Sequence, residues 1–201
     1  MRREKLEILD FEESKKVLDA AEWGVLGFSG STYPVLVPLN FTYANNHVYF
    51  HGALAGEKFK LAKENPNVSF AVVQAYSQLP SYFFDERAAC PATQLYKSVM
   101  LYGSLRLVSC DHEKAAALQA LMEKLQPEGG YERITAESSL YQNRLKGVAV
   151  IAMEVHKQST KFKLGQDRDE QWTENVLSQL QKRGCPVDHS TITEMRKLKK
   201  A

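Results

Sequence analysis

Cysteine is scarce in this chain, and the few cysteines present do not suit a disulfide framework. There are three, Cys90, Cys110 and Cys185, and an odd number at wide spacing fits reduced thiols. The histidines suit a metal no better. His47 and His51 flank a strand-like run, and four residues of strand separate them by about 13 Å, which is too far for one zinc ion. We therefore expect neither disulfides nor a bound metal.

The chain also lacks a large excess of charge of either sign, and it lacks long apolar runs. Lys and Arg number 26 against 24 Asp and Glu, so the formal net charge is only +2. Such a balance gives no general attraction to nucleic acid or to an anionic membrane. No run is long enough to span a bilayer, and the basic residues 1–5 are not followed by the apolar segment of a secretory signal. We expect a cytoplasmic protein that binds neither nucleic acid nor membranes.

The pattern that the chain does contain is that of a mainly β protein with flanking helices, an α+β fold. Its 201 residues, 44% of them hydrophobic, suffice for one main core. Short apolar runs joined by tight turns predict antiparallel strands, because parallel strands need helical crossovers. The predicted strands cover residues 24–28, 34–43, 47–51, 68–74, 98–108 and 147–156. The predicted helices cover residues 11–21 and 57–64, a segment capped by Asp111, and two C-terminal segments, the second opened by Thr191 and Glu194.

A long segment separates the strands predicted at residues 68–74 and 98–108. It exceeds twenty residues and carries five large apolar side chains: Tyr76, Leu79, Tyr82, Phe83 and Phe84. A loop of this length in a compact domain is usually functional or covers something, and this one is too apolar for a free linker. It is the natural wall of a substrate site.

The loop between the strand at 47–51 and the helix at 57–64 suits a phosphate group. Gly52 and Gly56 bracket it, and the helix start presents unpaired N–H groups with a partial positive charge. Lys58 and Lys60 lie in the first turn, where the helix dipole disfavours cations, so a bound anion would turn a penalty into a gain. From the residues alone, two solvated lysines after a plain turn explain the pattern equally well. The Walker and dinucleotide spacings are both missing.

Several motifs follow one another in a fixed order along the chain. They are Val37-Pro38-Leu39-Asn40-Phe41, Tyr49-Phe50-His51-Gly52-Ala53, Gly56-Glu57-Lys58, Asn65-Pro66-Asn67-Val68, Tyr96-Lys97-Ser98-Val99 followed by Gly103, and residues 161–168. The ordered set resembles the pyridoxamine 5'-phosphate oxidase-like superfamily of FMN-binding split barrels, and in particular its nitroimidazole-resistance-like branch. The resemblance covers about residues 5 to 168 and is far more specific than any one motif.

The resemblance implies a six-stranded antiparallel split β-barrel over residues 1–168, with a helical extension over residues 169–201. It also implies a homodimer that holds FMN at its interface. The resemblance places Val37, Pro38, Leu39 and Asn40 under the flavin ring, and His51, Gly52 and Lys58 along the ribityl phosphate. Ser98 and Val99 would touch the cofactor elsewhere. Lys161, Lys163 and Gln166 would lie on the side of the second subunit.

Taken singly, these residues have ordinary structural explanations. His51 fits a packing histidine at the end of an apolar strand, and Ser98 fits a strand surface. Pro38 and Asn40 fit edge-strand positions. Only their joint order favours a flavin site.

Two departures from the true oxidases bear on activity. Glu57-Lys58 stands where they carry an Arg-Lys pair, which leaves one cation fewer for the phosphate. Residues 165–168, Gly-Gln-Asp-Arg, lack the Arg-Leu-His-Asp-Arg pattern for the substrate phosphate, so we do not expect oxidation of vitamin B6.

Two functions therefore stay open. One is an FMN-dependent oxidoreductase that takes electrons from a small-molecule donor and acts on a small aromatic acceptor, namely a nitroaromatic, a quinone or another flavin. The absence of any convincing Ser-His-Asp, Cys-His or paired-carboxylate arrangement fits an enzyme whose cofactor carries the chemistry. The other is a non-catalytic sensor or store that binds flavin or haem, with the C-terminal helices facing a partner.

Overall fold

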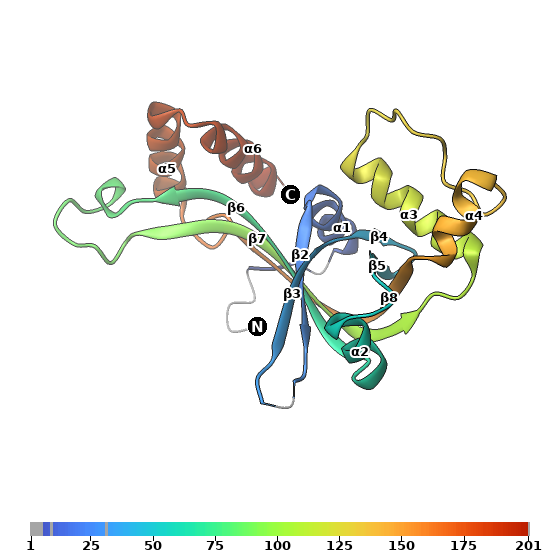
Figure 1. The fold of residues 1–201 in the computed structure, drawn as a ribbon. Helices are drawn as coiled ribbons and strands as arrows, with labels where there is room; N and C mark the ends of the chain where they lie inside the picture. The colour runs from blue at the N-terminus through green and yellow to red at the C-terminus, as the bar shows by residue number, and fades with distance from the viewer. Residues whose placement is uncertain (1–5, 9, 31, 201) are drawn as a thin grey trace. The chain divides into compact units, whose positions relative to one another are not determined.

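A computed structural model describes residues 6–8, 10–30 and 32–200 of the chain (Figure 1). Its strands are β1 (Glu7–Ile8), β2 (Trp23–Phe28), β3 (Val35–Asn40), β4 (Thr42–Ala44), β5 (His47–Gly52), β6 (Asn67–Leu79), β7 (Thr93–Leu107) and β8 (Ala149–Lys163). Its helices are α1 (Phe11–Ala20), α2 (Glu57–Glu64), the 3₁₀ helix η2 (Ser81–Phe83), α3 (Asp111–Leu125), α4 (Ser139–Lys146), α5 (Glu170–Arg183) and α6 (Pro186–Lys200). The fold is mainly antiparallel β with flanking helices, as the sequence predicts.

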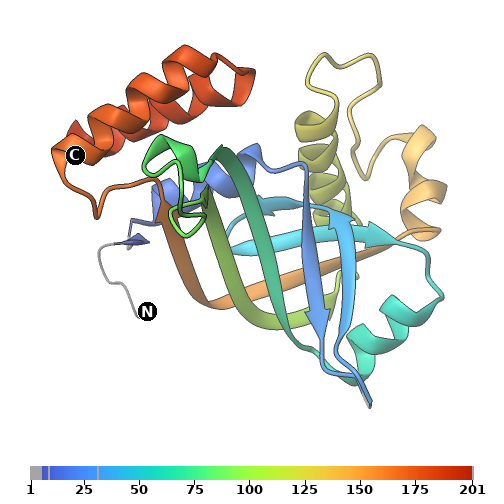
Figure 2. The same cartoon turned by 90° about the vertical axis from the view of Figure 1, so that its left-hand side faces the viewer.

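The strands form one sheet in the order β3-β2-β6-β7-β8-β5-β4, with β1 added to β8. β3 and β4 follow each other in the chain but lie at opposite ends of this order, because the chain changes pairing partner at Phe41. Asn40 of β3 pairs with Trp23 of β2, whereas Thr42 of β4 pairs with Tyr49 of β5. One buried residue thus joins the two ends of the sheet, which curls into a barrel (Figure 2).

Large apolar side chains at alternate strand positions fill the barrel. Leu26 and Phe28 of β2 and Phe70 of β6 are at most 2% exposed. Phe41 meets Phe70 edge to face, with ring centroids 4.8 Å apart. Gly24 leaves room for this packing, because a Cβ there would lie 2.3 Å from the Phe70 ring.

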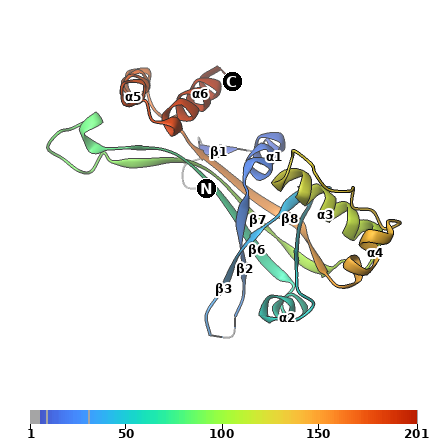
Figure 3. The same ribbon diagram turned by 45° about the horizontal axis from the view of Figure 1, so that its top comes forward.

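The chain divides into two compact units. The first, the barrel unit, consists of Glu12–Val72 and Val99–Ser159, and the second, the hairpin unit, consists of Met1–Phe11, Val73–Ser98 and Thr160–Ala201. Within the hairpin unit, α5 and α6 pack together near the outer parts of β6 and β7 (Figure 3). The core there is Tyr76, Leu79, Phe83, Leu95, Leu164, Val176, Leu180, Ile192 and Met195. The predicted domain boundary at residue 168 stays a prediction.

The structure corrects the predicted strands in two respects. Eight strands replace six, because β1 adds a short pair to β8 and the segment 34–43 divides at Phe41. The loop predicted between residues 74 and 98 is much shorter, because β6 continues to Leu79 and β7 begins at Thr93. Several of its apolar residues belong to the core of the hairpin unit and not to an open wall.

The helix starts differ as well. α3 begins at Asp111 with Cys110 at the cap position, so Asp111 is not the cap. α6 begins at Pro186 and not at Thr191, because the missing N–H and fixed φ of proline suit a first helical turn. Among the described residues, no helix combines the length and the apolar character needed to cross a membrane.

Candidate functional site

The loop after β5 leads directly into the N-terminus of α2. Gly56 occupies the cap position with φ 118° and ψ 169°, a conformation that other residues rarely adopt. Glycine has no side chain with which to cap the first N–H groups of the helix. Those groups, with their partial positive charge, are therefore left for water or for a ligand.

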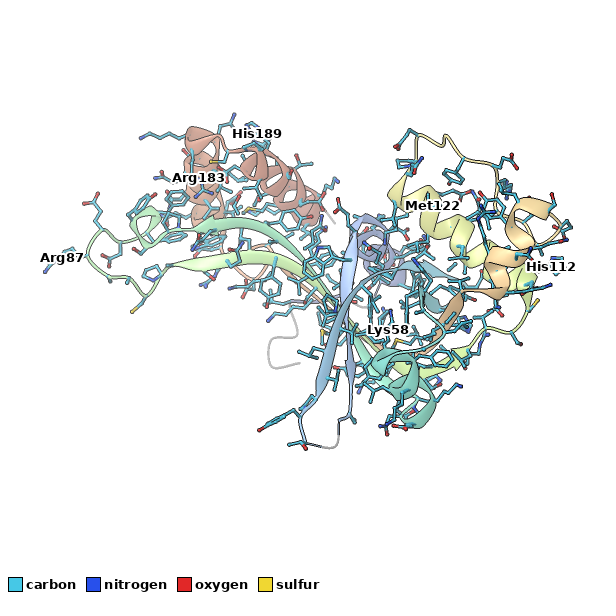
Figure 4. All side chains as sticks on the ribbon, in the orientation of Figure 1. Lys58, Arg87, His112, Met122, Arg183 and His189 are labelled. Atoms are coloured by element: carbon cyan, nitrogen blue, oxygen red, sulfur yellow. The ribbon has the colours of Figure 1, made fainter. Side chains whose placement is uncertain are left out.

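Lys58, in the first turn of α2, folds back over the end of β5 (Figure 4). Its Nζ donates a hydrogen bond to the backbone oxygen of His51 at 3.2 Å and lies 5.6 Å from the centre of the Phe50 ring. Gly52 makes this approach possible, because a Cβ there would lie 3.1 Å from both Cε and Nζ of Lys58. The glycine and the lysine thus form one compact feature.

The ammonium of Lys58 carries a charge that no described acidic side chain offsets. Burial lowers the pKa of Lys58, and no carboxylate acts to raise it. Lys60, two residues further along α2, is exposed, and its Nζ lies 3.9 Å from a carboxylate oxygen of Glu64. An anion bound at the loop would interact favourably with the Lys58 ammonium and with the N–H groups of the helix start.

His51 is the last side chain of β5 before Gly52, and it is exposed. Alternation along the strand puts Tyr49 and His51 on one face and Phe50 on the other. Lys58 contacts Phe50, so it reaches the backbone of His51 and not its ring. Partial desolvation and the charge of Lys58 both lower the pKa of His51. The two residues are therefore coupled through the charge of Lys58.

The four predicted flavin-ring positions lie on β3, at one end of the sheet order. Val37 and Leu39 are half-buried, while Pro38 and Asn40 are exposed on the other face. The side-chain amide of Asn40 donates to the backbone oxygen of Glu22 at 2.8 Å and anchors the end of the strand. The free edge of β3 leaves backbone groups for contacts of the predicted kind.

The remaining predicted residues contribute unequally. Val99 is fully buried in β7, so only its backbone can face a ligand. Lys161 and Lys163 both lie near the ring of Tyr96, with Nζ to centroid distances of 5.5 and 5.8 Å. Gln166 is committed to its own turn, because its amide bonds to the backbone of residues 162 and 164.

The structure thus brings Gly52 and Lys58 into contact and keeps them in the barrel unit with His51, Val99 and the β3 residues. The other predicted residues, Ser98, Lys161, Lys163 and Gln166, belong to the hairpin unit. A pocket of about 620 Å³ in the barrel unit, lined in part by Leu36, Tyr102 and His156, was not predicted from the sequence. The apolar run at residues 35–39 was a usable signal, because apolar residues at both alternating positions of a strand put an apolar side chain, here Leu36, on its outer face as well.

Comparison with known proteins identifies the fold family. The family model described as pyridoxamine 5'-phosphate oxidase matches residues 10–162. No curated protein matches the chain.

Solved structures share the fold. A candidate 5-nitroimidazole antibiotic resistance protein from Bacteroides thetaiotaomicron is 20% identical, with 78% of this chain and 86% of that one covered and a TM-score of 0.62. The flavocytochrome Anf3 from Azotobacter vinelandii is 26% identical, with 79% and 69% covered and a TM-score of 0.65. The FAD and heme binding protein from Mycobacterium smegmatis is 16% identical, with 86% and 79% covered and a TM-score of 0.66. Because the family model spans well over half of the chain and the architecture agrees with it, the chain belongs to the pyridoxamine 5'-phosphate oxidase family.

Proposed function

We propose that the protein is a flavoprotein that binds FMN, with the phosphate held by the loop at residues 52–56 and by Lys58. The observation that carries the proposal is the Lys58 ammonium, fixed against Gly52 at an uncapped helix start with no described acidic side chain to offset it. The 26% identity to a flavocytochrome supports a flavin ligand.

The donor set at this loop fits a phosphate monoester. Lys58 would supply a charge-assisted hydrogen bond, and the first N–H groups of α2 would supply others. Val37 and its neighbours on β3 would flank the flavin ring through backbone groups. FMN supplies redox chemistry when bound, and the residues of the chain bind and orient it.

We further propose an oxidoreductase that uses a small-molecule electron donor and a small aromatic acceptor, namely a nitroaromatic, a quinone or a flavin. The alternative, a non-catalytic flavin or haem sensor or store, is favoured by the likeness to a flavocytochrome. Anaerobic reduction of the purified protein by NADH or NADPH, followed by addition of a nitroaromatic or a quinone, separates the two. Rapid reoxidation supports the enzyme, and a stable reduced flavin supports the sensor or store.

We expect Lys58→Ala to weaken FMN binding by about tenfold to a hundredfold, because a hydrogen bond to a charged group contributes about 1.5–3 kcal/mol. Titration followed by flavin fluorescence measures the change. Lys60→Ala is the matched control, since Lys60 lies in the same turn but pairs with Glu64, and it should leave the affinity unchanged. Riboflavin, which lacks the phosphate, should bind the wild type and Lys58→Ala alike. Equal losses in the two lysine variants would contradict the phosphate assignment.

FMN affinity should also depend on pH through His51. In the free protein, partial burial and Lys58 hold the pKa of His51 below its usual 6.5. A phosphate beside Lys58 offsets that lysine's charge and raises the pKa of His51, so FMN should bind more tightly as pH falls from the bound-state pKa towards the free-state pKa. His51→Gln should flatten this gain. Riboflavin controls for ionisation of the phosphate itself, and an unchanged profile in His51→Gln would exclude His51 from the effect.

We also propose a homodimer with the flavin at its interface. Trp23 on β2, Tyr33 in the turn and Leu36 on β3 are 60%, 78% and 67% exposed. Large exposed apolar side chains along one hairpin favour an interface there. Light scattering of the FMN-bound protein at micromolar concentration should give twice the mass of one chain, and Leu36→Glu should shift the mass towards the monomer. A monomeric wild type would overturn the proposal.

A further inference from the structure

A second pocket lies wholly within the hairpin unit, where the β6–β7 loop, the end of β8 and the start of α5 come together. Its volume of about 420 Å³ falls in the range of small-molecule sites, about 300–1,000 Å³. Lys163, Arg168 and Trp172 line it, and all three lie beyond residue 162, where the family match ends. The pocket therefore depends on a part of the chain that the family model does not describe.

One wall of the pocket is aromatic and rigid. The rings of Phe84 and Trp172 are stacked, with centroids 5.7 Å apart and planes 8° from parallel. Gly165, at φ 86°, lets the chain pass close to Trp172, because a Cβ there would lie 2.3 Å from its ring. Asp169 caps α5 by accepting the backbone N–H of Trp172 at 2.8 Å. These contacts fix the position of the Trp172 ring beside Phe84.

The polar part of the pocket is cationic. Lys163 donates to the hydroxyl of Thr93, and the Arg168 guanidinium lies 5.6 Å from the centre of the Trp172 ring. Among the described residues, the partners of Lys163 and Arg168 are a hydroxyl and aromatic rings and include no carboxylate. Asp167 also lines the pocket and is engaged in an interaction of its own. The two cations of the lining are the groups that would attract an anion.

We propose that this pocket binds a small planar aromatic monocarboxylate, with its ring against Trp172 and Phe84 and its carboxylate on Lys163 and Arg168. Apolar contact comes from the ring wall and from Leu95, which is 1% exposed. The proposal is independent of flavin binding at Lys58, which lies in the other unit. It gives Lys163 a role different from the flavin contact that the family resemblance implies.

Benzoate is the probe, and calorimetric titration of the full-length protein is the measurement. We expect saturable binding with a Kd of about 1 mM or tighter. Benzamide has the ring without the charge, and cyclohexanecarboxylate has the charge without the aromatic ring, so both should bind at least tenfold more weakly. Absence of saturable benzoate binding, or equal binding of benzamide, would overturn the proposal.

Lys163→Met is expected to weaken benzoate binding by about tenfold to a hundredfold. Lys161→Met is the matched control, because Lys161 lies two residues away on β8 and near the same Tyr96 ring but outside the pocket. It should bind benzoate like the wild type. Equal losses in the two variants would reduce the effect to general electrostatics and remove the site.

The reactivity of Cys90 gives a second measure of benzoate binding, and it uses the wild-type protein, so no substitution can disturb the fold. It is exposed and lines the pocket, whereas Cys110 and Cys185 are exposed elsewhere. Benzoate should slow alkylation of Cys90 by iodoacetamide and leave the rates at the other two cysteines unchanged. FMN should not displace benzoate. Competition between FMN and benzoate would assign the pocket to the flavin site and overturn the inference, even with flavin binding intact.

Discussion

Asp188→Ala is expected to lower the free energy of unfolding of the hairpin unit by about 1.5–3 kcal/mol, because hydrogen bonds to a charged group contribute about that much and the buried Ser77 hydroxyl would lose an acceptor. Asp188 is fully buried and accepts hydrogen bonds from Arg183 Nε at 2.8 Å, from the Ser77 hydroxyl at 2.6 Å and from the backbone N–H of Cys185 at 3.0 Å. The contact with Cys185 caps the start of α6. Urea unfolding followed by circular dichroism measures the loss.

The same network makes stability depend on pH. Hydrogen bonds from Arg183 and Ser77 hold the pKa of Asp188 well below its usual 3.8. A carboxyl whose folded pKa is lowered contributes stability above its unfolded pKa and loses it as pH falls towards the folded value. The urea concentration at the unfolding midpoint of the wild type should therefore decrease as the pH is lowered below about 4. Asp188→Asn should show a shallower decline over the same range.

Two further variants test whether the network acts as a unit. Glu174→Ala removes an exposed acid from α5 and should change stability by less than about 0.5 kcal/mol. Arg183→Ala, at a position labelled in Figure 4, should cost at least as much as Asp188→Ala, because it leaves the buried Asp188 carboxylate without its ion pair. The double variant should cost less than the sum, because the two side chains share one interaction. Additive losses would show that they act separately.

Gly103→Ala is expected to destabilise the barrel unit by about 3 kcal/mol or more. A Cβ at Gly103 of β7 would lie 1.8 Å from the backbone oxygen of Glu154 on the neighbouring strand β8. That oxygen belongs to the sheet and cannot move aside without disturbing the pairing. Denaturant unfolding measures the effect.

Gly27→Ala is the control for Gly103→Ala. Gly27 is also in a strand of the barrel unit, but a Cβ there would meet only the Leu36 side chain at 3.4 Å and the Ser69 oxygen at 3.6 Å. These are ordinary contact distances, so we expect a change of about 1 kcal/mol or less. Equal destabilisation by the two variants would show that the close approach at Gly103 does not matter.

Features set by local chemistry were predictable from the sequence. Asn45 and Asn46, with φ of 50° and 61°, form the tight turn between the strands predicted at residues 34–43 and 47–51, and Gly184 ends α5 in the left-handed conformation. The change of pairing partner at Phe41 was not predictable in this way, because it depends on strands far away in the sequence. The start of α2 after Gly56 is also set by local chemistry, which is why the loop before it could be recognised in the sequence.

The length of β6 and β7 could not be read from the residues because the partners that cover them come much later in the chain. Leu79 and Leu95 are buried by contacts that include Val176 and Leu180. When only the local sequence is considered, the same apolar residues are typical of a long apolar loop. The direction of the Lys58 side chain was not predictable either, because its contacts with the backbone oxygen of His51 and the ring of Phe50 depend on how α2 lies against the end of β5.

The distribution of the hairpin unit along the chain has a consequence for synthesis. Leu79 and Leu180 pack in one core although about a hundred residues separate them. At about 5–20 residues per second, a ribosome needs roughly 5–20 s to deliver the second after the first. During that interval the apolar side chains of the β6–β7 hairpin lack their helical cover. The nascent chain is then most exposed to aggregation, and to the chaperones that bind such segments.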